Sequence, residues 1–457
     1  SAGGAFVAHR ALFNREGGQG NCERLSEGML EDTLVAPIWK RMLRSDFFQS
    51  TVKVVGGTAL AQAIGALTSP IIARLYTPED MSFLGLFLSF VGVASVVTTL
   101  RYEVAVVAVQ SEEEARSLVV GSLVVSGGLS VLAVGVFEFL RRKDIFGYGL
   151  FPPWATLLVG LALVAGSWTA ILRYFVLRLG LFHVVGPLAF YQALWRIAAQ
   201  MGLSFLGSAG LVLGEVVGRW AGLRSLWRVF AQSVVSWQIA WDALWSYRRY
   251  PFVQLPSSVL DTMALMAPVP VFTFVFGATV GGGLVLAQRV VGLPIALIGG
   301  SVADVFYSRA AELLRTHPGG LLAFFLATSW RILALGVALG FAMWAMGPWL
   351  AVKVFGPQWE EAGLMLRAMA PWMAAQMAVS PVSRVVFLSS RSWLKLVYDF
   401  TSLLAVGLPL WWKGNSAVHA LSIIAWTQVA LYALYFLVLL VVVRELSYHH
   451  RESGGER

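Results

Sequence analysis

The chain has few charged residues for its length. Of its 457 residues, only 13% are Asp, Glu, Lys or Arg, whereas 58% are hydrophobic. A soluble domain is about one quarter charged and about half apolar. This balance excludes an ordinary soluble domain and indicates a protein whose surface lies largely in a bilayer.

Several signatures of chemistry are also missing. The single cysteine, Cys22, excludes a disulfide framework and any multi-cysteine metal site. No lysine follows a glycine, so the phosphate-binding loop G-x-x-x-x-G-K-[ST] is absent, and ATP-driven transport by this chain alone is excluded. The histidines form no H-E-x-x-H, and no two aspartates lie two positions apart. The sequence therefore predicts no enzyme, no metal site and no cofactor.

The N-terminal residues 1–50 differ from the remainder. They are rich in glycine, mixed in charge and lack an apolar core of signal-peptide length. We expect a polar, disordered tail or an added extension, and assign it no function.

From Thr51 onward, apolar stretches recur at nearly regular spacing. About 20 apolar residues cross the hydrocarbon core as a helix, at about 1.5 Å per residue. The pattern predicts an all-α polytopic membrane protein with twelve spans: 52–75, 82–109, 115–139, 153–177, 182–205, 210–228, 258–279, 282–306, 320–344, 363–388, 395–412 and 417–444.

These spans fall into two six-helix lobes, 51–228 and 258–444. Between them, residues 229–257 are rich in Trp and Arg and read as an amphipathic linker on the cytoplasmic surface. A thirteenth span through 227–247 is the alternative. Residues 445–457 form a polar C-terminal tail.

Lys and Arg divide unevenly between the two sets of loops. With the N-terminus placed in the cytoplasm, the loops on the far side hold five of the 34 cations: Arg141, Arg142, Lys143, Lys353 and Lys413. The positive-inside rule then places both termini in the cytoplasm. The cytoplasmic loops account for the net charge of +9, so we expect no nucleic-acid partner.

The two lobes resemble each other in sequence. Segment 65–89 aligns with 263–287, which places Pro70 on Pro268 and Gly85 on Gly283. Each proline is predicted to bend the first helix of its lobe. A parallel repeat of this kind, about a pseudo-twofold axis along the membrane normal, is a transporter design with the substrate site between the lobes.

Several ordered blocks carry a family resemblance. They are "RLYTPEDMSFLGLFLS" (74–89), "LRYEVAVV" (100–107), "SEEEA" (111–115), "LVLAQRVVGLPIALIGGSVADVFYSRAAEL" (284–313), "VFGPQWEEAGLMLRAMAPWM" (354–373) and "SPVSRVVF" (380–387). Over about 45–445, the chain resembles bacterial polysaccharide-biosynthesis flippases, which move O-antigen and capsule repeat units. These belong to the multidrug/oligosaccharidyl-lipid/polysaccharide exporter superfamily. Met81 replaces the aromatic residue usual after "TPED".

The resemblance implies a fold, a substrate and partners. The two lobes would surround a central cavity that opens alternately to each side, lined largely by the first two helices of each lobe. The substrate would be an undecaprenyl-diphosphate-linked oligosaccharide, moved from the cytoplasmic to the periplasmic leaflet. Membrane lipids, and polysaccharide polymerases and glycosyltransferases, would be its partners.

Apart from the cations counted with the adjoining loops (Lys53, Arg116, Arg224, Arg228, Lys395 and Arg444), nine cations lie inside predicted spans, and all are arginines: Arg74, Arg101, Arg173, Arg196, Arg219, Arg289, Arg331, Arg367 and Arg384. Arginine pairs bidentately with phosphate oxygens, although an arginine near a helix end can instead extend to the interface. Arg289 is the strongest substrate-binding candidate, because it lies deep in a span expected to line the cavity. Arg331 is also a candidate. The helices of Arg331 and Arg196 are expected farther out, where hydrogen bonding between helices competes.

The remaining candidates are polar or paired. Gln62, in the same span as Pro70, could contact sugar hydroxyls, with helix packing as the alternative, and Gln288 is a substrate-binding candidate beside Arg289. Arg101 and Glu103 lie near the cytoplasmic end of their span, where Arg101 could first contact the diphosphate. They are two residues apart, so on a regular helix they would face different ways and could not pair. Asp304 is a candidate for ion coupling, with pairing to a nearby cation as the alternative.

Four glycines spaced by four, Gly210, Gly214, Gly218 and Gly222, predict close packing of one helix on its neighbour. Glu215 and Arg219, on the same helix, are expected to neutralise each other. The leading function is a lipid-linked oligosaccharide flippase. A cation-coupled multidrug or small-molecule exporter and a membrane protein without transport remain as alternatives.

Overall fold

The computed structural model describes residues 46–109, 111–230, 237–389, 393–410 and 416–454. It divides into two compact units, Ser1–Lys53 and Val54–Arg457. Most of the predicted tail at 1–50 therefore lies outside the described residues. The lobe boundaries expected from the sequence remain predictions.

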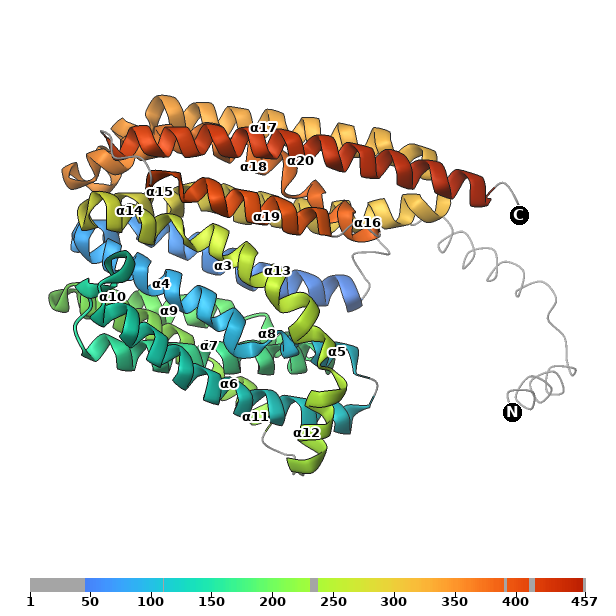
Figure 1. Cartoon of the computed structure of the whole chain (residues 1–457), viewed down its shortest axis with the longest axis horizontal. Coiled ribbons are helices and arrows are strands. Elements are labelled where there is room, and N and C mark those ends of the chain that lie inside the picture. The colour runs from blue at the N-terminus through green and yellow to red at the C-terminus, as the bar shows by residue number, and fades with distance from the viewer. Residues whose placement is uncertain (1–45, 110, 231–236, 390–392, 411–415, 455–457) are drawn as a thin grey trace, which may run out of the picture. The chain divides into compact units, whose positions relative to one another are not determined.

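All elements of the described chain are helices (Figure 1). The first twelve are α3 (Asp46–Leu75), α4 (Pro78–Thr99), α5 (Tyr102–Ala108), α6 (Glu112–Arg142), η1 (Ile145–Leu150), α7 (Trp154–Arg178), α8 (Phe182–Val185), α9 (Leu188–Gly202), η2 (Ser204–Leu206), α10 (Ser208–Trp220), α11 (Leu223–Phe230) and α12 (Trp237–Ser246). The others are α13 (Arg249–Met266), α14 (Pro268–Phe276), α15 (Ala278–Pro294), η3 (Ile295–Gly299), α16 (Gly300–Thr316), η4 (Pro318–Gly320), α17 (Leu321–Leu350), η5 (Ala351–Phe355), η6 (Pro357–Trp359), α18 (Glu360–Val379), η7 (Val382–Leu388), α19 (Trp393–Val406), η8 (Leu408–Leu410) and α20 (Ala417–Gly454).

The helices have the length and composition of membrane spans. Within the described residues, 8 are long and apolar enough to cross a bilayer, and up to 9 if α13 and α14 count as one bent span. Each of the twelve predicted spans contains at least one helix, and the all-α polytopic prediction is confirmed. Helix α20 runs through most of the predicted C-terminal tail. Of the proposed thirteenth span, residues 231–236 lie outside the description.

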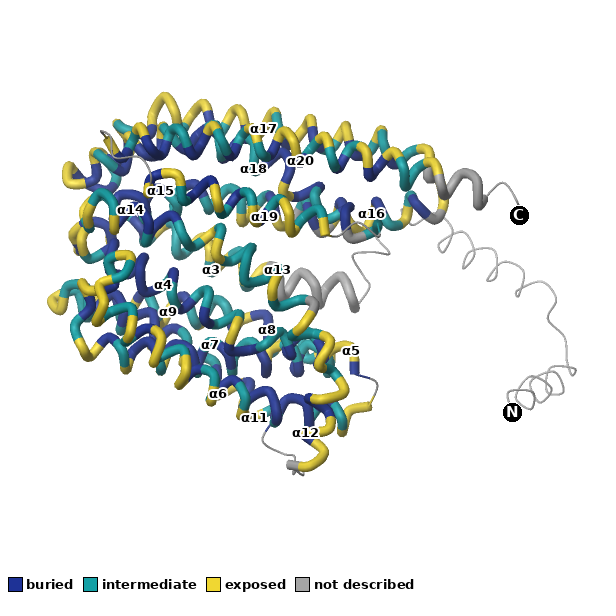
Figure 2. Tube along the Cα trace, viewed as in Figure 1, coloured by how far each residue is buried: buried dark blue, intermediate teal, exposed yellow. Residues whose placement is uncertain are grey.

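Exposed apolar side chains cover the outer face of the bundle. On α17, Val337, Phe341 and Trp344 are exposed, and the buried residues of that helix face its neighbours (Figure 2). Such apolar exposure along a whole helix is what a lipid-facing surface requires.

Prolines and caps place the helix ends. At α4, the Thr77 hydroxyl accepts a hydrogen bond from the Asp80 N–H at 3.2 Å, and the Asp80 carboxylate accepts one from the Thr77 N–H at 3.1 Å. With Pro78 at the first helical position, this capping box explains why the helix begins at "TPED". In the second half, α13 and α14 meet at a bend of 41° beside Pro268, whereas Pro70 lies inside the single helix α3.

The glycine stripe packs α10 directly on α9, as predicted. A Cβ at Gly218 would lie 2.6 Å from the Arg196 Cβ, and one at Gly214 would lie 2.3 Å from the Gln200 Cγ. Any side chain on this face would therefore push the two helices apart.

Glycines also bring α4 against α15. A Cβ at Gly85 would lie 2.2 Å from the Val285 Cγ2, and one at Gly282 would lie 1.7 Å from the Pro78 carbonyl oxygen. Because α4 and α15 belong to different halves of the sequence, this contact joins the halves.

We expect Gly218→Ala to lower the stability of the protein in detergent by about 1–3 kcal/mol, the usual cost of overpacking. Gly127→Ala is the matched control, since an added Cβ there meets nothing within 4 Å. Thermal unfolding of both variants checks this: equal melting temperatures would show that the α9–α10 contact tolerates a side chain.

Candidate functional site

A large polar hollow lies among helices from both halves of the sequence. It has a volume of about 700 Å³ and is lined by residues of α3, α4, α9, α10, α13, α14, α15 and η3. Polar side chains are spread over its wall: Thr58, Gln62, Ser69, Ser89, Gln192 and Gln288. A cavity of this size and polarity inside a membrane-spanning bundle is suited to a polar ligand.

Four charged side chains line this cavity, and they do not balance. Arg196, Arg219 and Arg289 supply three positive charges, and Glu215 supplies one negative charge. The Glu215 carboxylate lies 3.6 Å from the Arg196 Nη1 and 4.0 Å from the Arg219 Nε. The site therefore carries an excess of two positive charges.

Some donor atoms of these arginines have no hydrogen-bond partner among the described residues. The Nε atoms of Arg196 and Arg219 are buried and have no hydrogen-bond partner among the described residues. Arg289 makes no ion pair or hydrogen bond within the same part of the chain. Buried donor atoms without partners are costly, so the Nε atoms favour a ligand that supplies oxygen acceptors.

The structure brings together three of the residues predicted from sequence. Gln62 from α3, and Gln288 and Arg289 from α15, all line the cavity. Their contact with a substrate remains a prediction. Arg196 was expected away from the cavity and instead lines it, because the glycine stripe holds α9 against α10.

Two other candidates lie elsewhere. Arg331 is exposed on α17 and does not line the cavity. Asp304 belongs to α16, but its side chain lies outside the described residues, so its ion-coupling role stays a prediction.

Arg101 and Glu103 pair with each other, contrary to the sequence prediction. Leu100 and Arg101 adopt left-handed backbone conformations, with φ of 48° and 61°, and end the predicted span 82–109 as two helices, α4 and α5. Across this break the Arg101 Nη1 lies 3.2 Å from the Glu103 Oε1. The prediction was wrong because the backbone is not a regular helix there.

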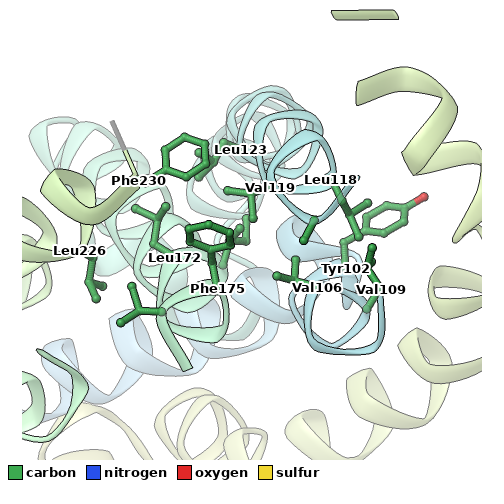
Figure 3. Close-up of a cluster of buried hydrophobic side chains, with 14 of the residues drawn as sticks. Tyr102, Val106, Val109, Leu118, Val119, Leu123, Leu172, Phe175, Leu226 and Phe230 are labelled. Atoms are coloured by element: carbon green, nitrogen blue, oxygen red, sulfur yellow. The ribbon is translucent and has the colours of Figure 1, made fainter. Parts of the chain in front are cut away.

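A buried apolar cluster holds this pair in place. Tyr102 and Val106 of α5 pack among Leu118, Phe175 and other side chains of α6, α7 and α11 (Figure 3). Glu103 is 4% exposed and neither it nor Arg101 lines the 700 Å³ cavity. Their position gives them a role at the α4–α5 break, separate from the cavity site.

One end of the bundle is closed by contacts between the halves. The Trp359 Nε1 donates to the Ala73 carbonyl at 2.8 Å, and Arg74 donates to the carbonyls of Lys353 and Val354 at 3.0 and 3.1 Å. These contacts join the end of α3 to the segment between α17 and α18. The two halves are therefore held together at the end where α3 stops and α4 begins.

Tyr76 adds a further tie at this end. Its hydroxyl donates to the Gln200 carbonyl of α9. Burial, with a smaller contribution from the Asp80 charge, raises the pKa of Tyr76 to about 12, so the hydroxyl stays protonated and remains a donor.

The sequence contained one signal for the missed site residues. Glu215 and Arg219 were expected to neutralise each other on one helix, and Arg196 was expected farther out, where hydrogen bonding between helices competes. Gln192 carried no signal of its own. The glycine stripe marks the surface that α9 covers, and it runs beside Glu215 and Arg219. The stripe therefore indicates that a charged residue of the neighbouring helix would meet them.

No protein-family model and no curated protein matches the chain. Solved structures do match it. An inward-facing multidrug resistance MATE-family transporter of the MOP superfamily has 13% identity and a TM-score of 0.62, over 87% of this chain and 96% of its own. The lipid II flippase MurJ, in an inward closed conformation, has 14% identity and a TM-score of 0.64, over 85% and 90%.

A third solved structure also matches the chain. A MOP-superfamily transporter from Pyrococcus furiosus, whose binding pocket is described as having reverse polarity that suggests a different function, has 14% identity and a TM-score of 0.53, over 89% of this chain and 98% of its own. The chain therefore has the fold of MOP-superfamily transporters. At these identities the likeness concerns the fold alone.

Removing the shared carboxylate should expose the charge imbalance. We expect Glu215→Gln to lower the free energy of unfolding by about 2 kcal/mol, less than for a fully buried pair because the cavity admits water. Arg289→Gln, which breaks no pair, should unfold at or above the wild-type temperature. Thermal unfolding in detergent measures both, and the reverse order would contradict the charge assignment.

Proposed function

We propose that the chain is a flippase for a lipid-linked oligosaccharide diphosphate, moving it from the cytoplasmic to the periplasmic leaflet of a bacterial inner membrane. The observation that carries the proposal is the cavity charge: three arginines, one glutamate and unpaired guanidinium donors. The transporter fold and the family resemblance in the sequence support it.

The chemistry of a diphosphate matches this charge. Its oxygens accept several hydrogen bonds, and the planar fork of arginine binds two at once. Inside the bundle, where charges are screened less than in bulk water, two excess positive charges attract an anion and repel a cation. A cation-coupled multidrug or small-molecule exporter, the alternative function, would need a buried carboxylate as its main site instead.

The remaining wall suits the sugars. Gln62, Gln192 and Gln288 present amide groups that both donate and accept hydrogen bonds, as sugar hydroxyls require. We therefore assign the arginines to the diphosphate and the amides to the oligosaccharide. Arg101, Glu103 and Arg331 are left out of this assignment because they do not line the cavity.

Alternating access would proceed through the contacts that join the end of α3 to the segment between α17 and α18. With both termini in the cytoplasm, that end faces the periplasm, and the cavity is in its inward-facing state. Release to the outer leaflet requires the Trp359–Ala73 and Arg74–Lys353 contacts to break. Glycosyltransferases would supply such a substrate and a polysaccharide polymerase would consume it.

Binding of undecaprenyl diphosphate to the purified protein tests the proposal. We expect Arg289→Gln to weaken binding by about 10- to 100-fold, the loss of one or two charge-assisted hydrogen bonds. Titration in detergent at two salt concentrations, followed by intrinsic Trp fluorescence, gives the affinity and its electrostatic part.

Arg331→Gln provides the matched control, since it makes the same change on an exposed arginine outside the cavity. It should bind as the wild type does. Equal affinity for the two variants would show that the diphosphate does not bind in the cavity. Tighter binding of a cationic drug than of the diphosphate would favour the exporter.

A further inference from the structure

A second hollow, which is almost entirely apolar, adjoins the charged cavity. Its volume is about 440 Å³. Its wall comes from α4, the end of α6, η1, α13, α14, α19 and η8, and includes Phe90, Val93, Met263, Pro270, Leu403 and Val406. We call it the apolar groove. The wall of the apolar groove is hydrophobic, whereas the wall of the cavity carries charged side chains.

The apolar groove and the cavity share a wall. Ser89 of α4 and Met266 of α13 line both. The Ser89 hydroxyl donates to the Met266 carbonyl at 3.0 Å. This hydrogen bond crosses the line of contact between α4 and α13, which we call the seam. Three residues further along α4, a Cβ at Gly92 would lie 3.4 Å from the Met266 Cγ and Sδ, so the Met266 side chain packs over this glycine.

The seam exists because of a proline. The Met266 carbonyl would normally accept from the N–H four residues later, but that residue is Pro270, which has none. The carbonyl therefore turns to Ser89. The two helices also pack against each other, so the Ser89–Met266 hydrogen bond is one local contact in the wall that the cavity and the apolar groove share.

An amphiphile fits this pair of spaces better than a wholly polar or wholly apolar ligand. Its anionic head would meet the excess positive charge of the cavity, and its hydrocarbon tail would lie in the apolar groove. Because lipid chains are as apolar as the groove, transfer of the tail from the bilayer brings no hydrophobic gain. The groove would therefore position the tail through packing, for which methionine and aromatic walls are adaptable.

We propose that the apolar groove holds the polyprenyl tail of the substrate while its diphosphate lies in the cavity, with the linkage crossing between α4 and α13 at Ser89 and Met266. This inference rests on the proposed function and adds where the tail lies. The head can then change sides while the tail stays beside α4, α13 and α19.

A substitution that fills the apolar groove distinguishes binding of the tail from binding of the head group. Leu403→Trp places a large ring in the groove, and Leu404→Trp makes the same change on the next residue, which is 59% exposed on the lipid side of α19. We expect Leu403→Trp to weaken binding of undecaprenyl diphosphate by about tenfold and to leave binding of inorganic diphosphate unchanged. Leu404→Trp should change neither.

The two proposals fail in different ways. If Leu403→Trp binds undecaprenyl diphosphate as the wild type does, while Arg289→Gln still binds it weakly, the groove inference is wrong and the flippase proposal stands. If neither diphosphate binds the wild type, both are wrong. Equal loss of both probes in Leu403→Trp would show damage to the cavity and would also overturn the groove.

Photo-cross-linking gives a second measurement that does not depend on a folded tryptophan variant. A photoreactive amino acid at Leu403 should attach to undecaprenyl diphosphate, and one at Leu404 should not do so above background. An ordinary phospholipid should be displaced from position 403 by the polyprenyl probe. Labelling by phospholipid that this probe does not displace would make the groove a general lipid contact and overturn the inference.

Discussion

One carboxylate shared by two guanidinium groups determines the character of the site. Glu215 lies between Arg196 and Arg219, and Arg289 adds a third cation to the same cavity. A charge inside a membrane bundle is costly unless it is paired or hydrated, so this imbalance constrains everything that surrounds it. The helices must leave space for water or a ligand, and they must hold the charges close enough to act together.

Glycine supplies both conditions. On α10 the stripe lets α9 approach until Arg196 meets Glu215, and on α4 and α15 Gly85 and Gly282 join the halves beside the cavity. Where the halves meet by backbone contact, the bundle is tight. Where α4 meets α13, a proline removes a helical hydrogen bond and a single serine replaces it. The charged cavity and the apolar groove lie on the two sides of that seam.

Hydrophobic patterning and caps made the helical fold predictable. Each predicted span contains a helix, and "TPED" forms the capping box that starts α4. Gln62, Gln288 and Arg289 could be placed at the cavity because their spans were expected to line it. The positions of Arg101 and Glu103 could not be predicted, because Leu100 and Arg101 adopt left-handed conformations that break the helix. No glycine at this break indicates it in the sequence. Arg196 required knowing which helix covers the glycine stripe.

A structure of the protein with bound undecaprenyl diphosphate tests the central claim most directly. The account predicts phosphate oxygens within hydrogen-bonding distance of the guanidinium groups of Arg196 and Arg289, inside the 700 Å³ cavity. Phosphates bound elsewhere, for example beside Arg101 at the α4–α5 break, with the cavity filled only by water, would contradict it.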